Sequence, residues 1–195
     1  MKKCLLLVFL LAMFVKDFSY SASVESKKRK GDSKMKILVV YYSRTGTTKK
    51  VAETIASDLK CDSEEIIDTK NRSGFWGYLK SGRDAMKKRL TILEPIKKNP
   101  ASYDLVVIGT PIWAWAVSAP VRTYIVQNAD KFKKVAFFCT MGGSGDIKAF
   151  KEMESISGKT AIASLGLRQS DVKNDSYKGK VDKFIEEIKW RVIVF

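Results

Sequence analysis

Apolar and polar residues follow two alternating patterns along the chain from about residue 36 onward. Short apolar runs, typical of strands that are covered on both faces, alternate with segments whose apolar residues recur every three or four positions, as on one face of a helix. The apolar runs, of which the second is partly polar, predict strands at residues 36–42, 63–68, 104–109, 134–139 and 160–167. The periodic segments predict helices at residues 47–60, 120–128, 147–157 and 177–190. Strands that alternate with helices indicate an α/β domain with a parallel sheet.

Hydroxyl side chains and a glycine connect the first predicted strand to the first predicted helix. The first amides of a helix have no intrahelical partner and carry the positive end of the helix dipole, so they attract an anion. The alternative is a capped strand-to-helix turn that happens to be polar. The motifs GxxxxGK[ST] and GxGxxG are absent, which disfavours a Walker site and a standard dinucleotide site. The loop therefore predicts a phosphate monoester site, with these candidate residues: Ser43, Arg44, Thr45, Gly46, Thr47 and Thr48.

Two further loops follow the third and fourth predicted strands. In a parallel sheet, ligands bind beyond the carboxyl ends of the strands, where these loops lie. Tryptophan rings offer flat partners to a planar aromatic ligand and exclude water from it, while glycines let backbone amides approach a ring edge. One of the two tryptophans is expected to face the ligand, and the other to pack under the following helix. The candidate residues of these loops are Pro111, Ile112, Trp113, Ala114, Trp115, Thr140, Met141, Gly142 and Gly143.

These three loops together resemble those of the flavodoxin family, over residues 36–189 approximately. The resemblance implies a flavodoxin-like three-layer α/β/α sandwich with a five-stranded parallel sheet in the order 2-1-3-4-5. It also implies FMN as the cofactor, with its phosphate on the first loop and its ring against Trp113, with Trp115 as a second partner. The pyrimidine edge would lie near residues 140–143. Because phosphate sites of this family use neutral donors, we expect Arg44 to be a solvated side chain.

Two function classes are compatible with this resemblance. A one-electron carrier is favoured, because no insertion in the chain obviously builds a substrate site. The alternative is an NAD(P)H-dependent FMN oxidoreductase, similar to quinone reductases. Flavodoxins often have a glycine beside the flavin N5, where a peptide flip stabilises the semiquinone, but Ala114 lies in the comparable stretch. That difference favours two-electron chemistry. A flavodoxin-like binding module without flavin is a third possibility.

Histidine is absent from the chain, and the three cysteines are Cys4, Cys61 and Cys139. This count supports neither a disulfide framework nor a Cys/His metal site. Without histidine as a general base, any chemistry is expected to belong to a bound cofactor, and no catalytic side chain or metal is predicted. Cys139, at the end of a predicted core strand, is expected to be a buried small apolar residue.

Positive charge exceeds negative charge both in the first 35 residues and in the rest of the chain. The chain has 36 lysines and arginines against 21 aspartates and glutamates. The first 35 residues contain 8 of the basic and 3 of the acidic residues. The remaining 28 basic and 18 acidic residues give residues 36–195 a net charge of +10. Electron-carrying flavodoxins are typically acidic, so this chain is expected to attract acidic redox proteins or an anionic cofactor such as NADPH. The cations are scattered without a nucleic-acid-binding motif, so nucleic acid is not an expected partner.

Residues 1–35 are expected to be a leader that precedes a domain at residues 36–195. An apolar run at residues 4–15 is too short to span a bilayer comfortably and resembles the core of a signal peptide. One interpretation is export through residues 1–23. The other is a cytoplasmic protein whose translation begins at Met35, with residues 1–34 misassigned.

Residues 74–89 are expected to form a loop that leads into a basic helix with an aromatic cluster at its start. The cluster, which includes Phe75 and Trp76, fits a lid beside the ligand or a docking face. An aromatic stripe on a helix is more often core, however, so we expect it to pack against the sheet. The last six residues, 190–195, are expected to be a strand-like tail or an interface.

Overall fold

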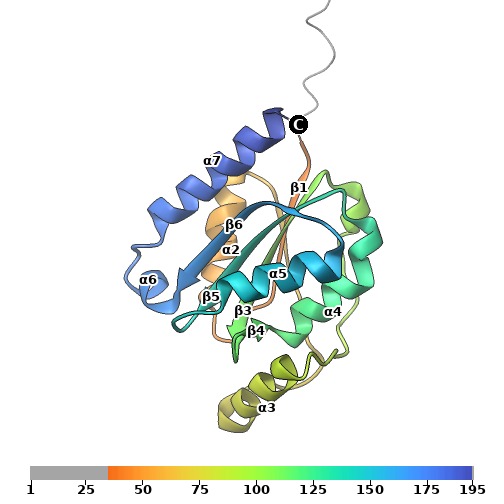
Figure 1. Cartoon of the computed structure of the whole chain (residues 1–195), viewed down its shortest axis with the longest axis vertical. Coiled ribbons are helices and arrows are strands. Elements are labelled where there is room, and N and C mark those ends of the chain that lie inside the picture. The colour runs from red at the N-terminus through yellow and green to blue at the C-terminus, as the bar shows by residue number, and fades with distance from the viewer. Residues whose placement is uncertain (1–34, 195) are drawn as a thin grey trace, which may run out of the picture. The chain divides into compact units, whose positions relative to one another are not determined.

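A parallel sheet forms the centre of the molecule (Figure 1). The computed structural model describes residues 35–194. The signal-like segment, and the leader up to residue 34, lie outside this range. The parallel strands lie in the order β2-β1-β3-β5-β6, and the short β4 pairs antiparallel with β3. The sequence did not predict β4, so β5 and β6 are the fourth and fifth predicted strands. With this change of numbering, the predicted order 2-1-3-4-5 is confirmed. The strands are β1 Ile37–Tyr41, β2 Asp62–Glu65, β3 Leu105–Trp113, β4 Ala116–Val117, β5 Lys134–Met141 and β6 Ala161–Arg168.

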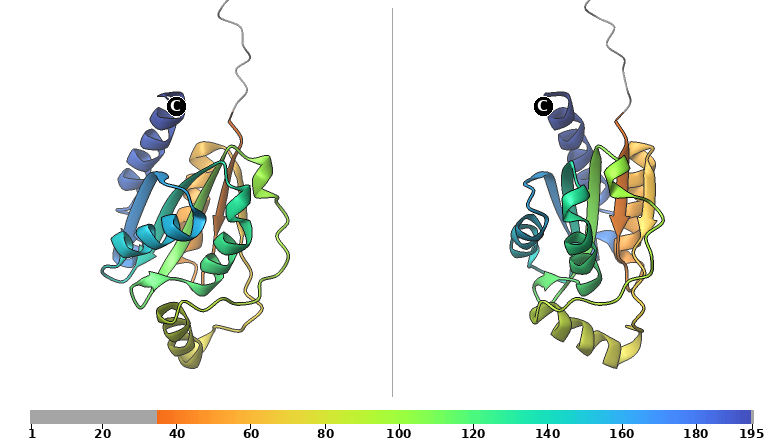
Figure 2. Two further views of the ribbon diagram at one scale, coloured as in Figure 1. Left: turned by 45° about the vertical axis from the view of Figure 1, so that its right-hand side comes forward. Right: turned by 90° about the vertical axis from the view of Figure 1, so that its right-hand side faces the viewer.

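Helices cover both faces of the sheet, as Figure 2 shows. Neighbouring residues of a strand point to opposite faces, so Leu38 and Val39 enter two different apolar clusters. Val39 packs with residues of α2 and α7, and Leu38 packs with residues of α4 and α5. This confirms the three-layer α/β/α fold. The covering helices are α2 Thr47–Leu59, α4 Ala119–Asn128, α5 Asp146–Ser157 and α7 Lys178–Val194, with shorter turns at η1 Pro100–Ser102, η2 Ala129–Lys131 and α6 Gln169–Lys173.

Helix α3, Gly74–Met86, lies across one end of the sheet and does not cover a face (Figure 1). The prediction that its aromatic cluster is core was wrong, because Phe75 and Trp76 are 68% and 72% exposed. The buried face of α3 contains small and polar residues, among them Gly77, Ser81 and Asp84. A Cβ at position 77 would lie 2.3 Å from the carbonyl carbon of Arg72, so only glycine permits this close approach.

Two smaller predictions also need correction. The second strand ends at Glu65 and not at Asp68, because the backbone at residues 67–69 bonds to residues 92–94 and no longer to β1. The end of the chain is not a strand-like tail, since α7 continues to Val194. None of the helices in residues 35–194 combines the length and the apolarity that a bilayer span requires.

Strands β3 and β4 form a tight hairpin where the sequence predicted an open loop. Trp113 pairs with Ala116, which leaves Ala114 and Trp115 as a two-residue turn. Both turn residues have positive φ, 48° and 58°, as a type I′ turn requires. Side chains with a Cβ adopt this conformation at a cost of about 1–2 kcal/mol per residue. The ladder and the surrounding packing therefore maintain a strained turn.

Replacing Ala114 with glycine is expected to stabilise the protein by about 1 kcal/mol, because glycine adopts positive φ without the steric cost of a Cβ. The midpoint of urea unfolding would rise at an unchanged slope. Ala116→Gly, in the adjacent strand β4, is the matched control and is expected to destabilise. A lower midpoint for Ala114→Gly than for the unsubstituted protein would mean that the turn is not strained.

Candidate functional site

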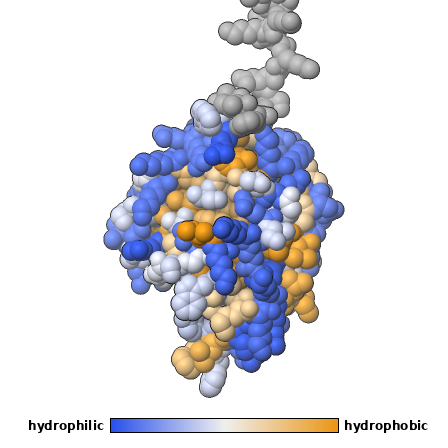
Figure 3. Space-filling model, in the orientation of Figure 1, coloured by the Kyte–Doolittle hydropathy of each residue, from blue (hydrophilic) through white to orange (hydrophobic). Residues whose placement is uncertain are grey.

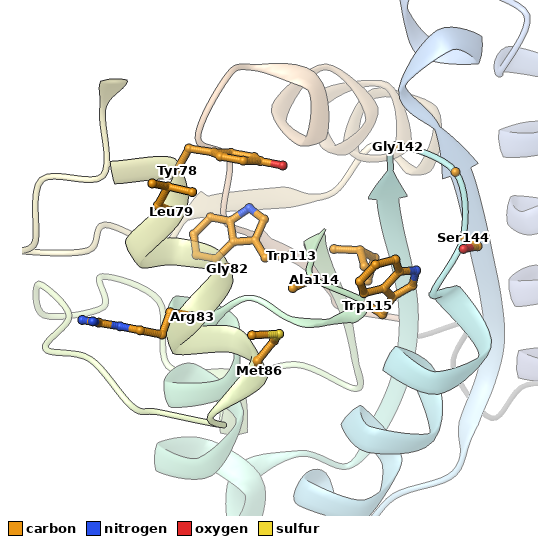
Figure 4. Close-up of a pocket in the computed structure, with 12 residues that line it drawn as sticks. Tyr78, Leu79, Gly82, Arg83, Met86, Trp113, Ala114, Trp115, Gly142 and Ser144 are labelled. Atoms are coloured by element: carbon orange, nitrogen blue, oxygen red, sulfur yellow. The ribbon is translucent and has the colours of Figure 1, made fainter. Parts of the chain in front are cut away.

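Two adjoining cavities lie beyond the carboxyl ends of β1, β3 and β5. The smaller has a volume of about 190 Å³ and the larger, drawn in Figure 4, about 580 Å³. They share four lining residues, namely Tyr78, Ile112, Trp113 and Gly142. All of the candidate residues predicted from the sequence line one or both cavities, except Ser43 and Gly46, which belong to the loop that borders the smaller one. The three predicted loops thus meet at one continuous site.

The smaller cavity is polar and is bordered by the start of α2. Thr45, Thr47 and Thr48 line it, and Gly46 takes the left-handed conformation at the helix N-terminus, with φ 84°. No side chain caps this helix. The Oγ atom of Ser43 is buried and has no hydrogen-bond partner. A buried hydroxyl group without a partner costs free energy, so these groups together fit a bound anion that would accept their hydrogen bonds.

Hydrogen bonds connect this loop to the two neighbouring strand ends. The hydroxyl groups of Thr48 and Thr140 lie 2.7 Å apart and are buried. The Nε2 atom of Gln169 donates to Oγ1 of Thr47 over 3.5 Å, and Gln169 also lines the smaller cavity. The sequence analysis missed Gln169, for which the only available signal was a polar residue two positions after the last predicted strand.

Arg44 lines the smaller cavity. It is half-buried, and its guanidinium carbon lies 5.3 Å from the centre of the Tyr78 ring. Arg44 is thus only partly solvated, because it packs against Tyr78. The contact is in the range of a cation–π interaction, and it joins the first loop to α3.

The larger cavity has mainly apolar walls. Figure 4 shows the β3–β4 hairpin with Trp113, Ala114 and Trp115 on one side and Tyr78, Leu79, Gly82 and Met86 of α3 on the other. Gly142, Gly143 and Ser144 close a third side. The α3 residues were not assigned to the site from the sequence, because that helix was expected to pack against the sheet.

The two tryptophans differ in their surroundings. Trp113 is 8% exposed, meets the Tyr42 ring edge-on at 5.6 Å, and packs in the apolar cluster that also contains residues of α4. Trp113 nevertheless lines both cavities, so it packs in the core and also borders the space that is open to a ligand. Trp115 does not pack under the next helix; it is 62% exposed at the hairpin tip and lines the larger cavity.

A buried arginine anchors α3 to the site. Arg72 donates from Nε to Asp68 over 2.5 Å and from Nη1 to Asp84 of α3 over 3.1 Å. Its guanidinium carbon lies 5.3 Å from the centre of the Trp113 ring. Burial lowers the pKa of Arg72, but the two carboxylates more than offset this effect and leave its pKa raised. Arg72 therefore connects both walls of the larger cavity through charged contacts.

Cys139 of β5 is buried, as expected. Burial, with a further contribution from the Asp146 carboxylate, raises the pKa of its thiol to about 12. At pH 8 almost none of the folded protein carries the thiolate, which is the reactive form.

We expect iodoacetamide to leave Cys139 unmodified in the native protein and to alkylate it fully in urea, as peptide mass spectrometry would measure. Rapid alkylation of Cys139 in the native protein at pH 8 would contradict the burial of this thiol and its raised pKa.

The fold and the site define an α/β protein with a polar cavity and an adjoining, mainly apolar cavity with aromatic walls at the carboxyl edge of its sheet. A sequence model described as flavodoxin matches residues 36–188. The chain therefore belongs to the flavodoxin family.

Similar solved structures agree with this fold. One is the crystal structure of a flavoprotein in complex with FMN from Lactobacillus acidophilus, which is 26% identical over 72% of this chain and 97% of that chain, with a TM-score of 0.58. Another is a candidate flavoprotein from Bacteroides eggerthii, which is 25% identical over 72% of this chain and 94% of that chain, with a TM-score of 0.58. No curated protein sequence matches the chain.

Proposed function

We propose that this protein binds FMN and acts as an electron-transfer flavoprotein. The observation that carries the proposal is the junction of a polar cavity, which includes the unpartnered start of α2, with an aromatic cavity large enough for a planar ring. The Lactobacillus acidophilus flavoprotein, with 26% identity, is described in complex with FMN, which supports the same ligand here. When bound, FMN supplies one- and two-electron redox chemistry, for which this chain offers no side chain of its own.

The residues of the smaller cavity are assigned to the phosphate. The hydroxyl groups of Ser43, Thr45 and Thr47 would donate hydrogen bonds to the phosphate oxygens, together with the first amides of α2. Thr48 is already bonded to Thr140, so its role is to fix the loop against β5. Hydroxyl and amide donors hold the charge of the phosphate without titrating near pH 7.

The residues of the larger cavity are assigned to the flavin ring. Trp113 and Trp115 offer aromatic surface on the hairpin side, and Tyr78 and Leu79 exclude water on the α3 side. The backbone amides near Gly142 and Gly143 are free of bulky side chains and suit the polar edge of the ring. An apolar wall with a few polar contacts is typical of small-molecule sites.

A second candidate function is an NAD(P)H-dependent FMN oxidoreductase. The observation in its favour is α3, which extends the wall of the larger cavity and gives space for a reactant beside a ring. The net charge of +15 would also attract an anionic nucleotide. The electron carrier remains the proposed function, because electron transfer requires only an exposed edge of the flavin ring. The oxidoreductase also requires a pocket that holds its substrate over the ring.

Anaerobic reduction of the FMN-loaded protein distinguishes these functions. A carrier predicts two separate one-electron steps in the flavin absorbance and no oxidation of NADH or NADPH. An oxidoreductase predicts one two-electron step and NAD(P)H oxidation that depends on an added quinone. A purified protein that is colourless and takes up no FMN would contradict both functions.

A further inference from the structure

The outward surface of α3 is cationic and aromatic, and it borders the opening of the larger cavity. Four exposed residues follow one another at spacings of four, three and four positions and so form one stripe along the helix. We call this the outer stripe of α3; it consists of Trp76, Lys80, Arg83 and Lys87, the last of which directly follows the final helical residue. The opposite face, with Gly77, Ser81 and Asp84, is buried. The stripe is therefore a solvent-facing surface and not part of the core.

Negative charge is missing from this surface. Between residues 69 and 93 the chain has seven lysines and arginines and a single acidic residue, Asp84. Asp84 is 7% exposed and is paired with Arg72 and Arg89, so its charge is compensated within the protein. Lys148 adds one further exposed cation, which lines a cavity beside Trp115 together with Lys88. The Glu152 carboxylate of that cavity is paired with Arg122. The opening of the larger cavity thus lies within a positive surface.

An aromatic pair lies at one end of the outer stripe. The rings of Phe75 and Trp76 are 5.7 Å apart in an edge-on arrangement and are both largely exposed. Figure 3 shows pale and orange residues bordered by hydrophilic blue residues at the lower end of the molecule, where α3 lies in Figure 1. Aromatic and arginine side chains inside a polar rim are characteristic of protein–protein interfaces.

We infer that the outer stripe of α3 docks an acidic redox protein, which exchanges electrons with the flavin through the adjacent cavity opening. This inference rests on the proposed function. An acidic partner is favoured over an anionic lipid surface because Tyr78, Leu79 and Met86 line the cavity. Among the large apolar side chains of α3, this leaves only Phe75 and Trp76 exposed outside the cavity. Two aromatic side chains are a small area for an interfacial helix, which needs a continuous apolar face.

Electron transfer from a reduced, acidic [2Fe–2S] ferredoxin to the FMN-loaded full chain tests the inference. The cluster loses one electron and the flavin gains one, and stopped-flow absorbance measures the second-order rate constant. We expect this constant to fall about tenfold between low salt and roughly 0.3 M salt, because ions screen the attraction. Basic cytochrome c, added to the reduced protein, is expected to show the opposite salt dependence.

Charge reversal on the stripe identifies the docking surface. Lys80→Glu with Lys87→Glu is expected to lower the rate constant with ferredoxin about tenfold or more at low salt. Neither lysine lines the two cavities assigned to FMN, so FMN affinity should be unchanged. The matched control is Lys183→Glu with Lys189→Glu on α7, which changes the net charge equally and is expected to alter the rate constant less than about twofold.

Binding measurements separate this inference from the proposed function. Calorimetry with oxidised ferredoxin, with and without FMN, is expected to give a weaker Kd for the stripe variant than for the α7 variant. Equal effects of the two variants would overturn the docking surface, even if FMN binds normally. Sedimentation with phosphatidylserine vesicles that depends on Lys80 and Lys87, without ferredoxin binding, would also overturn it, in favour of a membrane surface.

Discussion

Replacing Thr45 and Thr47 with isoleucine is expected to weaken FMN binding by about 100-fold or more. Each hydroxyl group would donate a hydrogen bond to the charged phosphate, and such bonds contribute about 1.5–3 kcal/mol each. Every 1.4 kcal/mol changes Kd about tenfold, so the loss of two bonds accounts for this effect. The larger side chains would also occupy part of the polar cavity, of about 190 Å³.

The fold should survive this change. Thr45 is exposed and Thr47 is half-buried, whereas the buried Thr48, which bonds to Thr140, is left in place. Titration of flavin fluorescence measures Kd, and circular dichroism measures the fold. Thr45→Ser with Thr47→Ser is the matched control; it keeps both hydroxyl groups and is expected to bind FMN within about threefold of the unsubstituted protein. Equal affinity for the isoleucine and serine variants would remove these hydroxyl groups from the site.

Arg72→Met is expected to destabilise the protein by about 3–5 kcal/mol, because it leaves the Asp68 and Asp84 carboxylates without their buried partner. In a protein of this size that loss lowers Tm by roughly 10 °C. It should also weaken FMN binding, since Arg72 joins Trp113 and α3, the two walls of the larger cavity. Thermal unfolding and FMN titration measure the two effects.

Arg89→Met is the matched control for this variant. Arg89 also pairs with Asp84, over 3.5 Å, but its side chain is 49% exposed. Exposed ion pairs contribute about 1 kcal/mol or less, so this change should lower Tm by only a few degrees. If Arg72→Met has no larger effect than Arg89→Met, the buried cluster does not hold α3 in place.

The strand order and the phosphate loop could be predicted because their signals are local. The apolar runs at β1, β3 and β5 have the continuous character that burial on both faces requires, and the loop from Ser43 to Thr48 lies between a clear strand and a clear helix. The carboxyl-edge rule then brings distant loops together. The contact between Thr48 and Thr140, 92 residues apart, is a direct consequence of that topology.

The position of α3 could not be predicted, because it depends on a tertiary ion cluster. Its aromatic residues have the spacing of a core helix, but the anchoring comes from Arg72, Asp68 and Asp84. Nothing in the local sequence indicates that these three charges meet. Once the face with Gly77 and Asp84 is buried, Phe75 and Trp76 must point to solvent.

The β3–β4 turn was missed for a different reason. Ala114 and Trp115 lack the asparagine and glycine that normally indicate a type I′ turn. The pairing of Trp113 with Ala116 imposes the two-residue turn, although Ala114 and Trp115 do not favour positive φ. Exceptions to local rules of this kind are expected where a ligand site is built.

Comparison of FMN with riboflavin tests the central claim most directly, because the two ligands share the ring and differ in the phosphate. Addition of each to flavin-free protein, followed by the loss of flavin fluorescence, gives stoichiometry and Kd. One equivalent of FMN is predicted to bind, about 100-fold or more tightly than riboflavin, through the hydroxyl groups and the α2 amides around the smaller cavity. Equal affinity for the two ligands, or no binding of either, would contradict the proposed flavin site.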